Sequence, residues 1–252
     1  MHGYRTLHHW NQWLSHDFLG RDLLDIEQSL TRQLLRHHFG KQAILVGVPS
    51  QQSLLCATSM AWHTISSPLM ATGLSGGPHY IEGDFHELPV LTGSMDLVLL
   101  PHTLEFVDNP RQLLSEVCRI IKPEGLVAIF GFNPYSVWGL KKQFSRPPSQ
   151  PWSGHYLPAA KVKNWLQLAD FSLEKQQRFL FRPHIKNESL YQKLHFLEHI
   201  GNVCCPMLGA AYVLLARAKV FPLTPIKMKW TQQLTGLRMP TTISGHIARQ
   251  SK

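Results

Sequence analysis

The sequence of 252 residues contains no long apolar run, which excludes a helix that crosses a lipid bilayer. Its first residues, Met1 to Arg5, lack the apolar centre of a secretory signal peptide. Cysteine is also scarce, and no paired spacing typical of a zinc site occurs among Cys56, Cys118, Cys204 and Cys205. We therefore expect a cytoplasmic protein without a disulfide framework, in which the adjacent Cys204 and Cys205 are packing residues and not metal ligands.

Acidic residues are scarce in the second half of the chain. Residues 131–252 contain 4 Asp/Glu and 17 Lys/Arg, whereas residues 1–130 contain 12 Asp/Glu and 8 Lys/Arg. The net charge of +9 therefore belongs to the second half. A basic half fits either a solvated surface or an anionic partner such as RNA, phospholipid headgroups or a phosphorylated metabolite. No named nucleic-acid-binding module is recognisable in the sequence.

The clearest pattern that is present lies between residues 83 and 133. Met95 to Leu100 is a nearly unbroken apolar run, which is typical of a strand buried on both faces of a parallel sheet. Asn109-Pro110 then supplies a side-chain cap and a proline suited to a first helical turn. Apolar residues follow at helical spacing, at Leu113, Leu114, Val117, Ile120 and Ile121. After a turn at 122–125, Leu126 to Phe130 is a second apolar strand, so the pattern predicts a right-handed β-α-β unit of an α/β fold.

Similar reasoning places the other elements. Further strands are expected at residues 43–47, 63–66, 79–82, 171–179 and 211–218. Helices are expected at residues 51–60 and 158–169, and two more lie within residues 8–40 with a break at 18–21. Trp10 and Trp13 in the first helix are expected to pack in the core, with a lid over a substrate as the alternative.

Four motifs in order carry a resemblance to a known family. They are an acid-x-x-x-Leu-Pro motif at 84–89, Asp-Leu-Val at 96–98, Leu-Glu at 104–105 and Arg-x-x-Lys-Pro-x-Gly at 119–125. The sequence resembles the class I S-adenosylmethionine (SAM) dependent methyltransferases, in particular the type 11 group, which methylates small molecules, lipids, quinones and some RNA. The resemblance implies a Rossmann-like seven-stranded mixed sheet of order 3-2-1-4-5-7-6, with helices on both faces and SAM as cofactor.

This resemblance also sets the expected domain organisation. We expect a helical cap at 1–40, a class I methyltransferase domain at 41–219 and a basic, flexible tail at 220–252. Within the domain, the basic and proline-rich residues 140–157 are either a lid loop or a disordered surface loop. Residues 182–206 form a helical insertion before the last strand.

The resemblance implies a cofactor site at the ends of four strands. Gly47 matches the first glycine of the family's loop, where the backbone approaches the methionine moiety of SAM. Asp84 matches the acid that accepts a hydrogen bond from the adenine amino group, and Phe85 matches the apolar neighbour that covers the ring. The predicted cofactor-binding residues are Gly47, Val48, Ser66, Asp84, Phe85, Leu100 and Pro101.

Several of these positions depart from the family pattern. Leu45 stands where an acid helps to bind the cofactor, and Ser66 stands where an acid binds both ribose hydroxyls. Pro49 and Gln51 occupy the second and third glycine positions, where proline donates no N–H and a side chain opposes close approach. These departures support the alternative of a catalytically degenerate, methyltransferase-like binding or regulatory protein.

A catalytic residue and a substrate pocket are expected at the same edge of the sheet. His102 follows the fourth strand, beside the switch point where open α/β sheets bind ligands. It is our candidate catalytic residue, either as a general base with an ordinary pKa of about 6.5 or as a positioning group. Asn133, Tyr135 and Trp138 follow the fifth strand and are expected to shape the substrate pocket.

The sequence therefore predicts methyl transfer from SAM to an acceptor that no motif identifies. A small-molecule or lipid-like acceptor is favoured, and the basic half suits an anionic one. An RNA-binding or RNA-modifying protein is a further alternative, through the same basic half. His195 and His199 are four residues apart, as helical metal ligands are, but no third ligand accompanies them, so we predict no metal site.

Overall fold

In the computed structural model, residues 2–69, 78–144, 154–185 and 187–220 are described. Seven strands form one sheet of order β3-β2-β1-β4-β5-β7-β6, as the sequence predicted. Strands β1 to β5 pair in parallel, whereas β7 is antiparallel to both β5 and β6. The strands are β1 Phe39–Val46, β2 Ser59–Ser67, β3 His79–Glu82, β4 Met95–Pro101, β5 Ile121–Phe132, β6 Phe171–Phe179 and β7 Ala211–Ala218.

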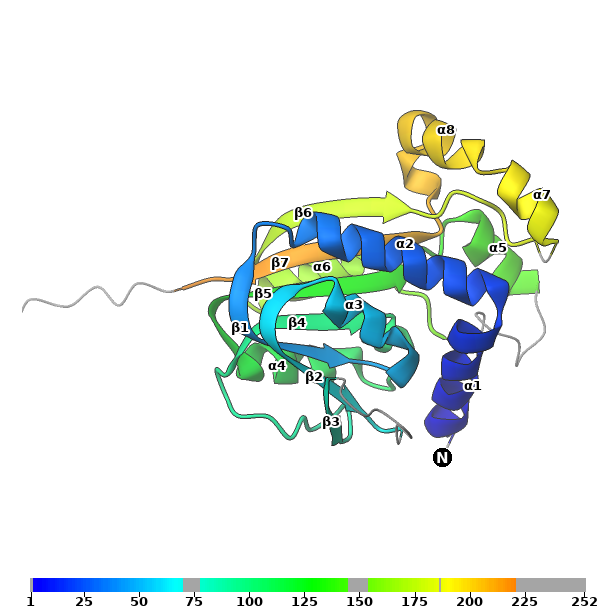
Figure 1. Cartoon of the computed structure of the whole chain (residues 1–252). Coiled ribbons are helices and arrows are strands. Elements are labelled where there is room, and N and C mark those ends of the chain that lie inside the picture. Colours follow the sequence, from blue (N-terminus) through cyan, green and yellow to red (C-terminus); the bar gives the residue numbers. More distant parts are fainter. Residues whose placement is uncertain (1, 70–77, 145–153, 186, 221–252) are drawn as a thin grey trace, which may run out of the picture. The chain divides into compact units, whose positions relative to one another are not determined.

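Helices cover both faces of the sheet. Figure 1 shows α2 and α3 over one face, and α4 and α6 over the other. The helices are α1 His2–His16, α2 Phe18–Leu34, α3 Gln52–Cys56, α4 Pro110–Ile120, α5 Val137–Phe144, α6 Ala159–Leu168, α7 Glu188–Lys193 and α8 Phe196–Cys204. Single 3₁₀ turns, η1 Pro49–Gln51, η2 Thr103–Glu105 and η3 Pro206–Leu208, lie at loop positions.

The core lies on the central strands. Leu97 to Leu100 of β4 are fully buried. Residues 126–132 of β5 and 211–216 of β7 are buried as well. Each such side chain contributes about 1.5–3 kcal/mol when it leaves water, so the two-faced burial of these strands is the main stabilising contribution. The carboxyl ends of β1, β4 and β5 are consequently fixed in position by the packed core.

The break between the N-terminal helices differs from the expected position. Asp17, not residues 18–21, separates α1 from α2, and its carboxylate accepts a hydrogen bond from the Leu19 N–H at 2.9 Å. Gly20 lies inside α2, at a position where a Cβ would come within 2.4 Å of the Trp13 carbonyl oxygen. The glycine therefore permits the close contact of the two helices and does not end one of them.

The predicted helix at 51–60 is mostly wrong. Only Gln52–Cys56 is α-helical, and β2 already begins at Ser59. Met60 and Trp62 pair with Gly40 and Gln42 of β1, so hydrogen bonding between the two strands prevails over local helical spacing. The first strand is longer than predicted for the same reason.

The turn predicted at 122–125 is wrong, because β5 already begins at Ile121, which pairs with Met95 of β4, and residues 122–125 form an irregular part of that strand pair. Several other boundaries follow the sequence patterns. The strands β3, β6 and β7 begin and end where the patterns placed them, at 79–82, 171–179 and 211–218. The insertion at 182–206 contains α7 and α8, whereas α5 occupies the first part of the expected lid loop at 140–157. Residues 145–153 of that loop and residues 221–252 of the tail lie outside the described residues, so the lid and the tail stay predictions.

Candidate functional site at the carboxyl edge of the sheet

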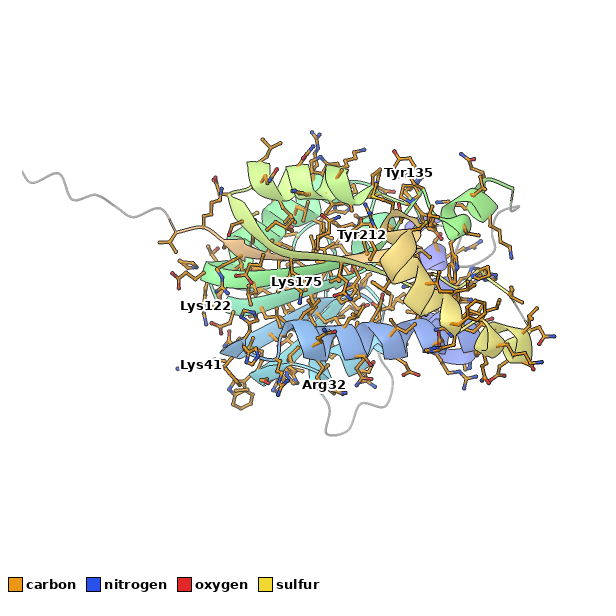
Figure 2. All side chains as sticks on the ribbon, turned by 90° about the horizontal axis from the view of Figure 1, so that it is seen from above. Arg32, Lys41, Lys122, Tyr135, Lys175 and Tyr212 are labelled. Carbon is orange, nitrogen blue, oxygen red and sulfur yellow. The ribbon has the colours of Figure 1, made fainter. Side chains whose placement is uncertain are left out.

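The loops after β1, β2, β3, β4 and β5 all leave the sheet at its carboxyl edge, which is where an open parallel sheet binds ligands. All predicted site residues except Trp138, which lies in α5, are in these loops or at the strand ends that lead into them. Figure 2 shows that Lys41 and Lys122, which belong to the amino ends of β1 and β5, lie at the opposite end of the sheet from Tyr135. Part of the positive charge is therefore remote from this edge.

The loop after β1 is closed by the side chain of Gln51. The Gln51 carboxamide oxygen accepts a hydrogen bond from the Val48 N–H at 3.1 Å, and its nitrogen donates to the Pro101 carbonyl at 3.0 Å. Gln51 is fully buried, and a Cβ added to Gly47 would lie 2.5 Å from its carboxamide oxygen. Gly47, Val48, Leu100 and Pro101 thus come together as predicted, but a side chain of the protein lies against them.

The next two predicted cofactor contacts lie at the ends of β2 and β3. Ser66 is fully buried, and its hydroxyl has no hydrogen-bond partner among the described residues. Asp84 is exposed, and its carboxylate accepts a hydrogen bond from the His86 N–H at 3.1 Å. Phe85 beside it is buried in the core. The ends of β2 and β3 therefore carry two polar groups, the Ser66 hydroxyl without a hydrogen-bond partner among the described residues and the exposed Asp84 carboxylate.

His102 is held between two carboxylates. Its Nε2 lies 2.7 Å from Glu27 Oε1, and its Nδ1 lies 3.2 Å from Glu105 Oε2. Glu27 comes from α2 and Glu105 from η2, and all three side chains are buried. The Phe132 N–H donates to the other Glu105 oxygen, whereas Glu27 Oε2 is buried with no partner among the described residues.

The environment of His102 sets its protonation state. Burial alone lowers the pKa of His102, but the charges and hydrogen bonds of Glu27 and Glu105 outweigh burial and raise its pKa to about 10. The ring is therefore an imidazolium at neutral pH and has no lone pair with which to accept a proton. This favours the positioning role over the general base for the candidate catalytic residue.

Aromatic side chains cover this charged cluster. Trp10 of α1 is buried with its ring centroid 5.4 Å from that of His102, and Phe132 lies 4.2 Å from it on another side. Trp10 also stacks on Trp13 at 5.2 Å and contacts Phe106 at 5.1 Å. Trp10 is thus a core residue, as expected, and it is the part of α1 that closes over the end of β4.

The three predicted pocket residues have different environments. Asn133 is buried and donates to the carbonyl groups of Met207 and Gly209, so it joins the end of β5 to η3. Trp138 is buried and its indole N–H donates to the Arg182 carbonyl at 2.8 Å. Tyr135 is 75% exposed and lines a cavity of about 450 Å³ with other apolar residues, namely Pro134, Val137, Leu140 and Leu208. Of the three predicted pocket residues, Tyr135 lines this cavity.

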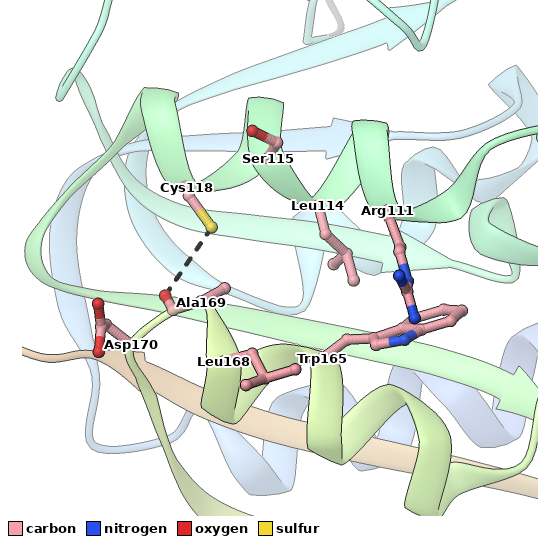
Figure 3. A pocket seen from close by; sticks show the side chains of 8 residues that line it. All are labelled: Arg111, Leu114, Ser115, Cys118, Trp165, Leu168, Ala169 and Asp170. Atoms are coloured by element: carbon pink, nitrogen blue, oxygen red, sulfur yellow. Dashed lines mark hydrogen bonds between the residues drawn. The ribbon is translucent and has the colours of Figure 1, made fainter.

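A second cavity, of about 390 Å³, lies between α4 and α6. Figure 3 shows it lined by Arg111, Leu114, Ser115, Cys118, Trp165, Leu168, Ala169 and Asp170. Burial raises the pKa of the Cys118 thiol to about 11, so the thiol is protonated and unreactive at neutral pH. None of the predicted site residues lines this cavity.

The strand order and the antiparallel β7 are those of the class I SAM-dependent methyltransferase fold. A family model described as a methyltransferase domain matches residues 50–129. The uncharacterized protein YafS of Escherichia coli K12 is 29% identical over 164 residues, which span 65% of this chain and 65% of YafS.

Solved structures share the fold. The chain is similar to a complex between the Trm112 methyltransferase activator and a methyltransferase from Haloferax volcanii, with a TM-score of 0.60, 13% identity and 84% and 98% of the two chains covered. A SAM-dependent methyltransferase from Thermotoga maritima gives a TM-score of 0.58 at 16% identity, with 85% and 97% covered. Residues 50–129 thus match a methyltransferase domain, and the chain shares the fold of solved SAM-dependent methyltransferases over most of its length.

The family and the fold imply SAM as the cofactor, and the residues present fit one half of it. At the nucleoside end, the orphaned Ser66 hydroxyl and the exposed Asp84 carboxylate suit ribose and adenine. At the methionine end, Gln51 fills the loop and uses its Val48 N–H. The chain in this conformation therefore does not fit the methionine half of SAM.

Sequence reasoning missed the partners that close the site. Glu27 lies in the middle of α2, and nothing in its local sequence indicates contact with a residue 75 positions away. Gln51 was noted as a departure from glycine, but the return of its side chain to Pro101 depends on the position of β4. A carboxylate on the apolar stripe of α2 was the one signal available, because such a residue needs a buried partner.

Proposed function

We propose that this protein is a methyltransferase that binds the nucleoside of SAM at the carboxyl edge of β1, β2 and β3. The observation that carries the proposal is the convergence of Gly47, Ser66 and Asp84 at this edge of a class I sheet. The Asp84 carboxylate accepts a hydrogen bond from the adenine amino group. The buried Phe85 side chain anchors the loop that carries Asp84. The reaction of this class needs chiefly positioning of the acceptor in line with the transferred methyl group.

We assign the acceptor side to the cavity beside the carboxyl end of β5. Tyr135, Val137 and Leu140 expose apolar surface there, with exposed fractions of 75%, 51% and 58%. Mostly apolar walls suit a small, lipid-like acceptor.

The nucleoside site is tested by calorimetric titration with SAM and with S-adenosylhomocysteine. We expect micromolar binding that weakens about tenfold or more in Asp84→Ala, because hydrogen bonds to a charged group contribute about 1.5–3 kcal/mol. Asp25→Ala is the matched control, since Asp25 is an exposed acid of α2 outside the site. Folded protein that binds neither ligand, or an Asp84→Ala variant that binds as the native chain does, would contradict the assignment.

A catalytically degenerate binding or regulatory protein is the second candidate. The specific observation in its favour is the burial of Gln51 and His102 where a cofactor and an acceptor would meet. The two candidates differ in one measurement, which is transfer of a labelled methyl group from SAM to extracted small molecules and lipids. Transfer above the background of Asp84→Ala supports the enzyme, and binding of SAM without transfer supports the regulatory protein.

The other candidate partners rest on composition. RNA binding is proposed only through the basic half, in which two cations are in ion pairs, Arg182 with Glu198 at 2.9 Å and Arg217 with Glu174. Within the described ranges, no helix has the length and hydropathy needed to cross a bilayer. Cys56, Cys118 and Cys205 are free thiols, which supports our proposal of a cytoplasmic location.

A further inference from the structure

The side chain of Gln51 bridges two backbone groups that belong to different strands. Val48 N–H lies in the loop after β1, and the Pro101 carbonyl lies at the end of β4. Both residues are predicted contacts of the cofactor, and both are buried by the carboxamide that joins them. The Val48 N–H and the Pro101 carbonyl, which could otherwise bind a ligand, are therefore already hydrogen-bonded to Gln51.

A carboxamide is chemically suited to replace the amino-acid end of SAM. That end carries an ammonium group, which donates hydrogen bonds, and a carboxylate, which accepts them. The Gln51 nitrogen donates to the Pro101 carbonyl, and its oxygen accepts from the Val48 N–H. One neutral side chain thus makes both kinds of bond, and it loses less hydration on burial than a pair of charges would.

The packing leaves this side chain little freedom. Its oxygen lies against the Gly47 backbone, where an added Cβ would be only 2.5 Å away. The preceding residue is tied to α1, because the Ser50 N–H donates to Asn11 Oδ1 at 3.0 Å. The bond to Val48 also completes the hydrogen bonding of the turn η1, so the same contact stabilises the loop.

We propose that Gln51 is an internal ligand that occupies the methionine end of the cofactor site. The resting protein accordingly accepts adenosines that end at a small 5′ substituent and gains no affinity from an amino-acid tail. SAM and S-adenosylhomocysteine must displace the carboxamide before their tails bind. The inference rests on the proposed function for the nucleoside half of the site, at Ser66 and Asp84.

The experiment compares two ligands that share the nucleoside and differ in the tail. S-adenosylhomocysteine and 5′-methylthioadenosine are titrated calorimetrically into the full chain and into Gln51→Gly, which restores the family's glycine. In the native chain we expect dissociation constants within about threefold of each other. In Gln51→Gly we expect S-adenosylhomocysteine to bind at least tenfold tighter, with 5′-methylthioadenosine unchanged.

Gln52→Ala is the matched control, because it changes a neighbouring glutamine that makes neither bond, and it should leave the ratio of the two affinities unaltered. If Gln51→Gly fails to fold, Gln51→Ala takes its place, since it also removes the carboxamide. A native chain that binds S-adenosylhomocysteine ten times tighter than 5′-methylthioadenosine overturns the internal ligand. Equal gains for both ligands in Gln51→Gly overturn it too, whereas binding of neither ligand by any variant overturns the proposed function itself.

Discussion

Gly20 shows how a single residue sets the position of α1 over the site. A Cβ at this position would lie 2.4 Å from the Trp13 carbonyl oxygen and 2.8 Å from the Leu14 Cα, both of which are backbone atoms. Trp10 and Asn11, which contact the ends of β4 and η1, belong to the same helix α1. The absence of one side chain therefore determines how closely the helix approaches the carboxyl edge.

Replacing this glycine should reverse an ordinary stability effect. Alanine in the interior of a helix is usually favoured over glycine by about 1 kcal/mol. We expect Gly20→Ala instead to lower the free energy of unfolding by about 1–3 kcal/mol, because the backbone of α1 must move away. Urea titration measures the change, Ser29→Ala on the exposed side of α2 is the control, and a stabilised Gly20→Ala variant would exclude a close packed contact.

The elements around the acceptor side are joined through Arg182. Its guanidinium lies 2.9 Å from Asp22 of α2 and 2.9 Å from Glu198 of α8, and its carbon centre lies 4.2 Å from the ring centroid of Tyr191 in α7. Its carbonyl accepts the hydrogen bond from Trp138 of α5. One nearly buried arginine thus connects four helices that are distant in the sequence.

Removal of that charge should loosen the insertion before it affects the sheet. Arg182→Met keeps the apolar length of the side chain but leaves Asp22 and Glu198 without their partner. We expect amide hydrogen exchange in α7 and α8 to become at least tenfold faster, while β4 and β5 exchange as before. Hydrogen-exchange mass spectrometry measures both, with Lys175→Met at an exposed position of β6 as the control, and unchanged protection of α7 and α8 would show that Arg182 does not hold the insertion.

The stability of the whole fold depends in part on buried charges that link the N-terminal helix α2 to the carboxyl edge of the sheet. Glu27 on α2 and Glu105 on η2 hold His102 at a pKa of about 10, against about 6.5 for an ordinary histidine. Lys142 of α5 also lies within electrostatic reach of Glu105, and burial lowers the pKa of this lysine. Because the folded state binds the His102 proton more tightly than the unfolded state, the cluster stabilises the fold most below pH 6.5.

The stability of the native protein should therefore fall as the pH rises from 6.5 towards 10. Glu27→Gln should cost about 3–5 kcal/mol at neutral pH, because it removes one partner of a buried ion pair. The fall with pH should be shallower in this variant, since the raised pKa depends on Glu27. Urea unfolding at several pH values measures both effects, and Glu87→Gln, a change at an exposed acid, is the control. Parallel pH profiles for Glu27→Gln and the native chain would contradict this linkage.

Much of the fold was predictable because its signals are local. Strands buried on both faces must be apolar throughout, so Met95 to Leu100 and the run at 211–218 were recognisable without any knowledge of their neighbours. The helix predicted at 51–60 failed because β2 extends along β1, and strand pairing is decided by the partner. The motif order indicated the site loops, since parallel strands bring their carboxyl ends to one edge.

The sequence by itself determined the class of fold, the edge that carries the site and the position of Asp84 and His102 along the chain. Only the tertiary structure decided what these residues contact. Glu27 reaches His102 across 75 residues, and Gln51 reaches Pro101 across 50, through the packing of α2 and β4. Hydrophobic periodicity is a local property of the sequence. The hydrogen-bond partner of a buried polar group depends on which residues the fold brings next to it, and these can be distant in the sequence.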